Sequence, residues 1–186
     1  MRRGHFLLLA ALGLPGLAHA QIAGAPWRVG PTVVIDGSAD DARVPLVHAA
    51  VAHWNQILAG IGSGFRLGRV TVRGGAEIGN IRVVLSDGEF ISNVRRFADG
   101  QGAVAMIRNT RGLPMSLPNV ARNVIAHELG HAIGLGHNGN PALLMCGRPA
   151  SCRPALFAST TARYFPLSEE EKAKLLGMYP ANWKSQ

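Results

Sequence analysis

Three histidines in one short segment have a spacing suited to binding a single metal ion. Residues 127–137 read HELGHAIGLGH. His127 and His131 are four residues apart, so on a helix their Cβ atoms lie about 5–6 Å apart and both imidazoles can reach one ion. Gly134 has no Cβ, can take a positive φ angle, and can end the helix so that His137 returns to the same ion. Three protein ligands leave a position for water, which is typical of a catalytic rather than a structural zinc.

Glu128 directly follows the first of these histidines. On a helix its carboxylate projects beside the ion rather than onto it, where a general base must lie. Zinc lowers the pKa of its water to about 7, and Glu128 could take the proton released when that water attacks a carbonyl carbon. These residues predict metal-assisted hydrolysis. The alternative is a binding module that is not an enzyme, in which zinc only stabilises the fold and Glu128 has no such role.

A helix over about residues 119–133 is expected to carry the first two histidines, with Asn119 as its N-cap. Its buried stripe consists of apolar residues spaced by four, namely Ile125, Leu129 and Ile133. At 100° per residue, His127 and His131 lie on nearly the opposite side from Ile125 and Leu129. The helix therefore packs on one side and presents imidazoles on the other.

The other expected elements are short strands and two further helices. The first helix covers 44–58, with Asp40 and Asp41 just before it and an apolar stripe of Val47, Val51, Trp54 and Leu58. A last amphipathic helix lies near 168–178. The glycine- and polar-rich stretch 86–103 is expected to be a loop that contains Arg95 and Arg96. Strands are expected at 32–35, 66–73, 81–85 and 103–107.

Residues 1–20 have the pattern of a signal peptide. They combine a basic start, the apolar run FLLLAALGL and a final Ala-His-Ala. The alternative, a membrane anchor, would need roughly 20 apolar residues, and Pro15 interrupts the run well before that length. We expect cleavage before Gln21 and a secreted mature chain, extracellular or periplasmic, without a membrane anchor.

The mature chain contains two cysteines, Cys146 and Cys152. A close pair in an exported protein favours a small disulfide loop. The alternatives are two free thiols, or a thiol bound to zinc. Removal of two arginines with the signal peptide lowers the formal net charge from +8 to +6. The basic residues are scattered rather than interleaved with aromatics, so we expect no nucleic-acid partner.

The eleven-residue segment resembles the signature of the metzincin zinc proteases, HExxHxxGxxH, and the following residues resemble matrixins. Met145 follows His137 by eight residues and is preceded by Pro-Ala-Leu-Leu, which matches the Met-turn of that family. The stretch from Leu167 to Tyr179 resembles the family's last helix. The clear resemblance covers about 120–180.

This resemblance implies an α+β fold, with a twisted mixed sheet, two helices and a small C-terminal subdomain ending in a helix. The upper subdomain would cover about 21–137 and the lower about 138–186. The resemblance further implies a monomeric zinc endopeptidase that acts on proteins or peptides. Residues 103–107 would form the edge strand to which an extended peptide adds. Calcium, which the family often binds, could contact Asp87 and Glu89.

The sequence departs from the family at several positions. The last helix begins with Glu170 and Glu171 where the family usually has an Asp pair. The Tyr-Pro-x-Tyr wall of the specificity pocket is replaced by Cys-Gly-Arg-Pro at 146–149. The chain has no His-containing loop for a structural zinc and no cysteine-switch propeptide. A second alternative keeps zinc hydrolysis but acts on a small amide or on cell-envelope material. His48 and His53 lie about 140° apart on the first helix and are not expected to bind metal.

Overall fold

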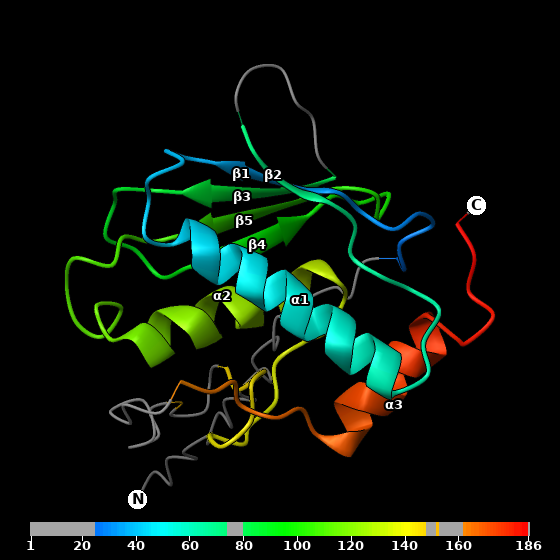
Figure 1. Cartoon of the computed structure of the whole chain (residues 1–186). Helices are drawn as coiled ribbons and strands as arrows, with labels where there is room; N and C mark the ends of the chain where they lie inside the picture. The colour runs from blue at the N-terminus through cyan, green and yellow to red at the C-terminus, as the bar shows by residue number, and fades with distance from the viewer. Residues whose placement is uncertain (1–24, 74–79, 148–151, 153–161, 186) are drawn as a thin grey trace, which may run out of the picture.

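The computed structural model describes residues 25–73, 80–147, 152 and 162–185 (Figure 1). The predicted signal peptide at 1–20 lies outside this part of the chain, as do Arg148 and Pro149, which stand where the resembled family has its pocket wall. Within it, no helix has both the length and the apolar character needed to cross a membrane.

A five-stranded sheet forms one layer of the molecule, with the order β2-β1-β3-β5-β4. The four strands β2, β1, β3 and β5 are mutually parallel, and β4 pairs antiparallel with β5. Alternating burial along β3 and β5 places one set of side chains in the core. The strands are β1 (Val33–Asp36), β2 (Val70–Val72), β3 (Ile81–Leu85), β4 (Asn93–Arg96) and β5 (Ala103–Ile107).

Strand β4 corrects two sequence-based expectations. It lies within the stretch 86–103 that was expected to be a loop, so Arg95 and Arg96 belong to a strand. It also forms the edge of the sheet, whereas β5 lies between β3 and β4. The prediction that 103–107 is the edge strand is therefore wrong, because the antiparallel strand β4 covers that edge. The strand expected over 66–73 is also shorter and begins only at Val70.

Two helices, α1 (Val44–Gly60) and α2 (Pro118–Ala132), lie side by side against one face of the sheet (Figure 1). The predicted apolar stripes of both helices are buried, at 5% exposure or less. The third helix, α3 (Glu169–Met178), lies beyond them, and Ser168 and Glu171 form a capping box at its start. The fold is therefore α+β, as predicted.

The N-cap prediction for α2 is wrong. The helix begins at Pro118 with Leu117 as N-cap, because proline at the first helical position needs no hydrogen-bond partner for its nitrogen. The side chain of Asn119 instead accepts a hydrogen bond from the Arg163 backbone N–H at 3.2 Å. One turn later, Asn123 accepts from the Phe165 N–H at 2.8 Å. These asparagines fasten the chain before α3 to the histidine-bearing helix.

Arg43 joins the start of α1 to the ends of two strands. The residue is 3% exposed, and its side chain donates to the carbonyl oxygens of Ser86 at 2.7 Å and Ile107 at 3.1 Å. Asp41 accepts from the same guanidinium and balances its charge. A buried arginine with these partners fixes the helix layer against the sheet.

Candidate metal centre

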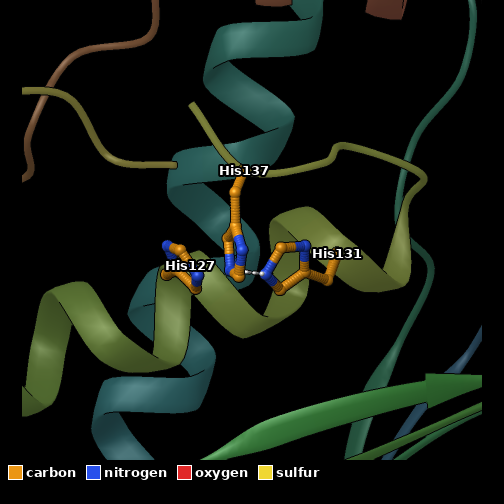
Figure 2. Close-up of side chains that lie close together, drawn as sticks. All are labelled: His127, His131 and His137. Atoms are coloured by element: carbon orange, nitrogen blue, oxygen red, sulfur yellow. Dashed lines mark hydrogen bonds between the residues drawn. The ribbon is translucent and has the colours of Figure 1, made fainter. Parts of the chain in front are cut away.

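Three imidazoles converge on one point at the surface of α2 (Figure 2). His127 and His131 project from the helix, and His137 reaches them from the loop that follows it. One ring nitrogen from each residue lies within 4.8 Å of the others. The Nε2 atoms of His131 and His137 are 3.0 Å apart. The histidines predicted to share an ion are therefore brought together.

Backbone carbonyl groups orient the two helical imidazoles. The Nδ1 atom of His127 lies 2.7 Å from the Leu144 oxygen, and that of His131 lies 2.8 Å from the Leu135 oxygen. A carbonyl only accepts, so each Nδ1 carries the proton and each Nε2 keeps a lone pair. A ring N–H bonded to a carbonyl is the usual support of a metal-binding histidine. The pattern therefore leaves Nε2 as the ligand atom in both residues.

The burial of these rings keeps them neutral. Desolvation lowers the pKa of His127 to about 4 and that of His131 to about 3. Burial also lowers the pKa of His137, although this side chain is more exposed. Neutral imidazole is the form that binds metal, so protons compete little for these nitrogens at pH 7. The donor set of three neutral nitrogens suits zinc.

Glu128 is a buried carboxyl group next to the first histidine in the chain. Its side chain is 5% exposed, and its Oε2 atom has no hydrogen-bond partner among the described residues. Burial raises the pKa of Glu128 to about 8. A nearby divalent cation would favour the charged form of such a group. An unpartnered buried carboxylate oxygen thus fits a cation at the histidines.

The turn that returns His137 begins at Gly134, whose φ is +105°. Two aromatic side chains satisfy the carbonyl groups of the last residue of α2 and of the C-cap residue that follows it. Trp27 Nε1 donates to the Ala132 oxygen at 2.8 Å, and the Tyr179 hydroxyl donates to the Ile133 oxygen at 2.9 Å. Sequence reasoning predicted neither contact, since both residues lie far from the motif in the chain. They fix the point at which the helix ends.

Met145 is fully buried beneath α2, and its neighbour Leu144 supplies the carbonyl that orients His127. Cys146 and Cys152 form a disulfide, with Cα atoms 5.7 Å apart. The disulfide excludes the alternatives of free thiols and of a thiolate bound to the metal. Residues 148–151 and 153–161 of the surrounding segment lie outside the described part of the chain.

The remaining candidate ligands lie elsewhere. Asp87 forms an exposed ion pair with Arg111 at 2.9 Å. Over the residues that the structure describes, the three histidines form the only group of three or more potential ligands close enough to share an ion. The calcium prediction for Asp87 and Glu89 gains no support. His48 is exposed, and His53 stacks on Tyr164 with ring centroids 3.9 Å apart.

No family model matches the sequence, and no curated protein matches it. Among solved structures, the chain is similar to a crystal structure of myroilysin, with a TM-score of 0.51 and 13% sequence identity, covering 86% of this chain and 87% of that one. A crystal structure of archaemetzincin from Methanopyrus kandleri matches with a TM-score of 0.43 and 14% identity, over 85% of this chain and 97% of the other. The first likeness shows that the two chains share a fold.

Proposed function

We propose that the chain is a secreted zinc endopeptidase of the metzincin, matrixin-like kind, with His127, His131 and His137 as zinc ligands. The convergence of three neutral imidazoles, two of them fixed through Nδ1 by backbone carbonyls, carries this proposal. The proposal also depends on the α+β fold, and the likeness to myroilysin supports that fold.

A zinc ion held here would lower the pKa of a bound water and polarise the carbonyl of a peptide bond. Glu128 would act as the general base, taking a proton from the attacking water and passing it to the leaving amine nitrogen. Its buried position keeps the carboxyl group away from bulk solvent. The three imidazoles would bind and orient the ion, and Met145 would pack beneath them as the Met-turn.

A peptide substrate would bind in extended form along β4, rather than along β5 as the resemblance implied. The edge position of β4 supports this, because an edge strand offers unpaired backbone groups to an added strand. Strand β4 also packs near α2, which carries two of the histidines. The mature chain would begin at Gln21, act as a monomer, and divide near residue 137 into upper and lower subdomains.

The disulfide supports an oxidising location outside the cytoplasm, in agreement with the signal-peptide pattern at 1–20.

The function is tested by incubating purified 21–186 with a mixed peptide library. Cut sites are then read by mass spectrometry. We expect cleavage that stops when a chelator removes zinc. Zinc binding without any hydrolysis would favour the binding module. Hydrolysis confined to small amides or cell-envelope material would favour the amidase.

A further inference from the structure

The third histidine is held differently from the first two. Carbonyl oxygens fix the rings of His127 and His131 at Nδ1. Among the hydrogen bonds of the described residues, the ring of His137 makes only the contact with His131, through Nε2. His137 is also exposed, whereas the other two are partly buried. Its orientation must therefore come from the backbone that carries it and from groups packed against its ring.

The next residue, Asn138, fixes that backbone on both sides. Its N–H donates to the Met145 oxygen at 2.8 Å, and its carbonyl accepts from the Gly147 N–H at 3.1 Å. These two bonds make a short β-bridge between Asn138 and Cys146. The chain carrying His137 is thus paired with the segment around Met145.

Gly147 contacts the His137 ring itself. A Cβ atom at this glycine would lie 2.1 Å from the ring carbons of His137, far inside contact distance. Only glycine allows the backbone to approach the ring so closely. The backbone at position 147 therefore supports one side of the imidazole.

The side chain of Asn138 connects this bridge to α3. Its Nδ2 donates to Glu171 Oε1 at 2.6 Å, and its Oδ1 accepts from the Asn140 N–H at 2.8 Å. The second carboxylate oxygen of Glu171 accepts from the Ser168 N–H at 2.8 Å, and the Glu171 side chain is largely buried. The carboxylate that caps α3 therefore also holds the residue beside His137.

We propose that Asn138 is a positioning residue for the third metal ligand, held by Glu171. Among the described residues, this link takes the place of the Nδ1–carbonyl hydrogen bond that orients His127 and His131. The inference rests on the proposed zinc site. It assigns Glu171, where the resembled family usually has an aspartate, to two tasks, one for each carboxylate oxygen. Loss of the link should loosen the backbone that carries His137, while His127 and His131 keep the carbonyl groups that hold their Nδ1 atoms.

The test compares the rate at which zinc passes from the full mature chain to a chelator. Asn138→Ala should speed zinc release by about 10- to 100-fold, the usual effect of losing a hydrogen bond that supports a metal ligand. Asn140→Ala is the matched control, because Asn140 lies in the same exposed loop and donates to Asn138 through its backbone, which the substitution keeps. Ser168→Ala is the second control, since it removes the hydroxyl that caps α3 and leaves the Asn138–Glu171 bond.

We expect both controls to release zinc at the wild-type rate. Gly147→Ala should also speed release, since its methyl group would displace the His137 ring, and it tests the same geometry should Asn138→Ala fold poorly. A wild-type release rate in a folded Asn138→Ala would overturn the inference, whatever Gly147→Ala shows. Equal acceleration in Asn140→Ala or Ser168→Ala would overturn it as well, by showing general loosening. A wild-type chain that binds no zinc would contradict the proposed function itself.

Discussion

Met145 packs against Gly130 so closely that a Cβ atom on the glycine would lie 2.5 Å from the methionine sulfur. The same Cβ would lie 2.9 Å from the Trp54 ring. Gly130 is in the helical turn that separates the two helical histidines, and both neighbours are fully buried. The absence of a side chain at Gly130 therefore allows Met145 to lie directly beneath the ligand-bearing part of α2.

Gly130→Ala should destabilise the fold, although alanine favours helices. Overpacking a buried site costs about 1–3 kcal/mol, which we expect to exceed the helix preference of about 1 kcal/mol. Gly177→Ala in α3 is the matched control, because its Cβ would meet nothing within 4 Å. It should stabilise the protein by about 0.5–1 kcal/mol. Urea unfolding of both variants measures these effects, and a stabilising Gly130→Ala would contradict the close contact.

Met145→Ala offers a second check on the same contact. Alone it should lower the free energy of unfolding by about 2–5 kcal/mol, as buried methionine truncations do. Combined with Gly130→Ala it should cost less than the sum, because the new methyl group occupies part of the cavity. Additive effects in this double-mutant cycle would show that the two sites are independent.

His131→Ala should abolish tight zinc binding. It removes one of three converging nitrogens, so the zinc affinity should fall by more than the roughly 100-fold upper effect of losing a supporting hydrogen bond. His48→Ala should leave zinc content unchanged, because His48 is an exposed residue outside the metal group. Metal analysis after dialysis measures the zinc content of both variants. Full zinc occupancy in His131→Ala would contradict the assignment of His131 as a ligand.

The metal group could be predicted from sequence because its geometry is local. A four-residue helical spacing and a glycine turn are enough to bring His137 back to the helix, and the structure has Gly134 at φ +105°. The supporting residues could not be predicted. Trp27 and Tyr179 meet α2 from opposite ends of the chain, 152 residues apart, and a periodic pattern carries no signal for such a pair.

Strand β4 is a second feature that could not be predicted from the sequence. Its residues alternate between exposed and partly buried, and none is fully buried, so the usual apolar alternation is absent. Asn93, Arg95 and Arg96 are polar, and only pairing with β5 makes the segment a strand. The fold class was still predicted correctly, because the buried stripes of α1 and α2 and the apolar strands were recognised. The edge strand was predicted wrongly, because β4 was not recognised as a strand.

Asp41→Asn should lower stability at neutral pH and lose its effect in acid. The Arg43 side chain, which donates to Asp41 Oδ1 at 2.9 Å, holds the pKa of this carboxyl below its usual value. A lowered folded pKa contributes stability that is present above the unfolded value of about 3.9 and is lost as pH falls through the folded pKa. We expect a deficit of about 1.5–3 kcal/mol at pH 7, the range for hydrogen bonds to charged groups.

Urea unfolding of wild type and Asp41→Asn at several pH values measures this difference. The gap between the two proteins should begin to narrow below the unfolded value of about 3.9 and should close as the pH falls through the lower pKa of the folded Asp41 carboxyl. Asp40→Asn is the control, since Asp40 is exposed and should show no such gap. A gap that stays constant down to acidic pH would assign the effect of Asp41 to packing rather than to charge.

Glu128→Gln separates an enzyme from a binding module. Glutamine keeps the size of the side chain and cannot take a proton, so folding and zinc content should survive. Peptidase activity should fall by about 10²–10⁴-fold, the usual contribution of a positioned general base. Burial alone raises the pKa of Glu128 to about 8, which would leave it protonated at pH 7. The base function therefore depends on the cation that the three histidines would hold, whose charge favours the carboxylate.

Glu170→Gln provides the matched control, because it removes the same charge from an exposed position at the start of α3. It should keep wild-type activity and wild-type zinc content. Cleavage of a peptide library, read by mass spectrometry alongside metal analysis, measures both properties in each protein. If Glu128→Gln cleaved at the wild-type rate, the proposed general base would be wrong, even with zinc at the three histidines. If the zinc-loaded wild type cleaved nothing, the carboxyl group would be a buried structural residue and the binding module would be the better account.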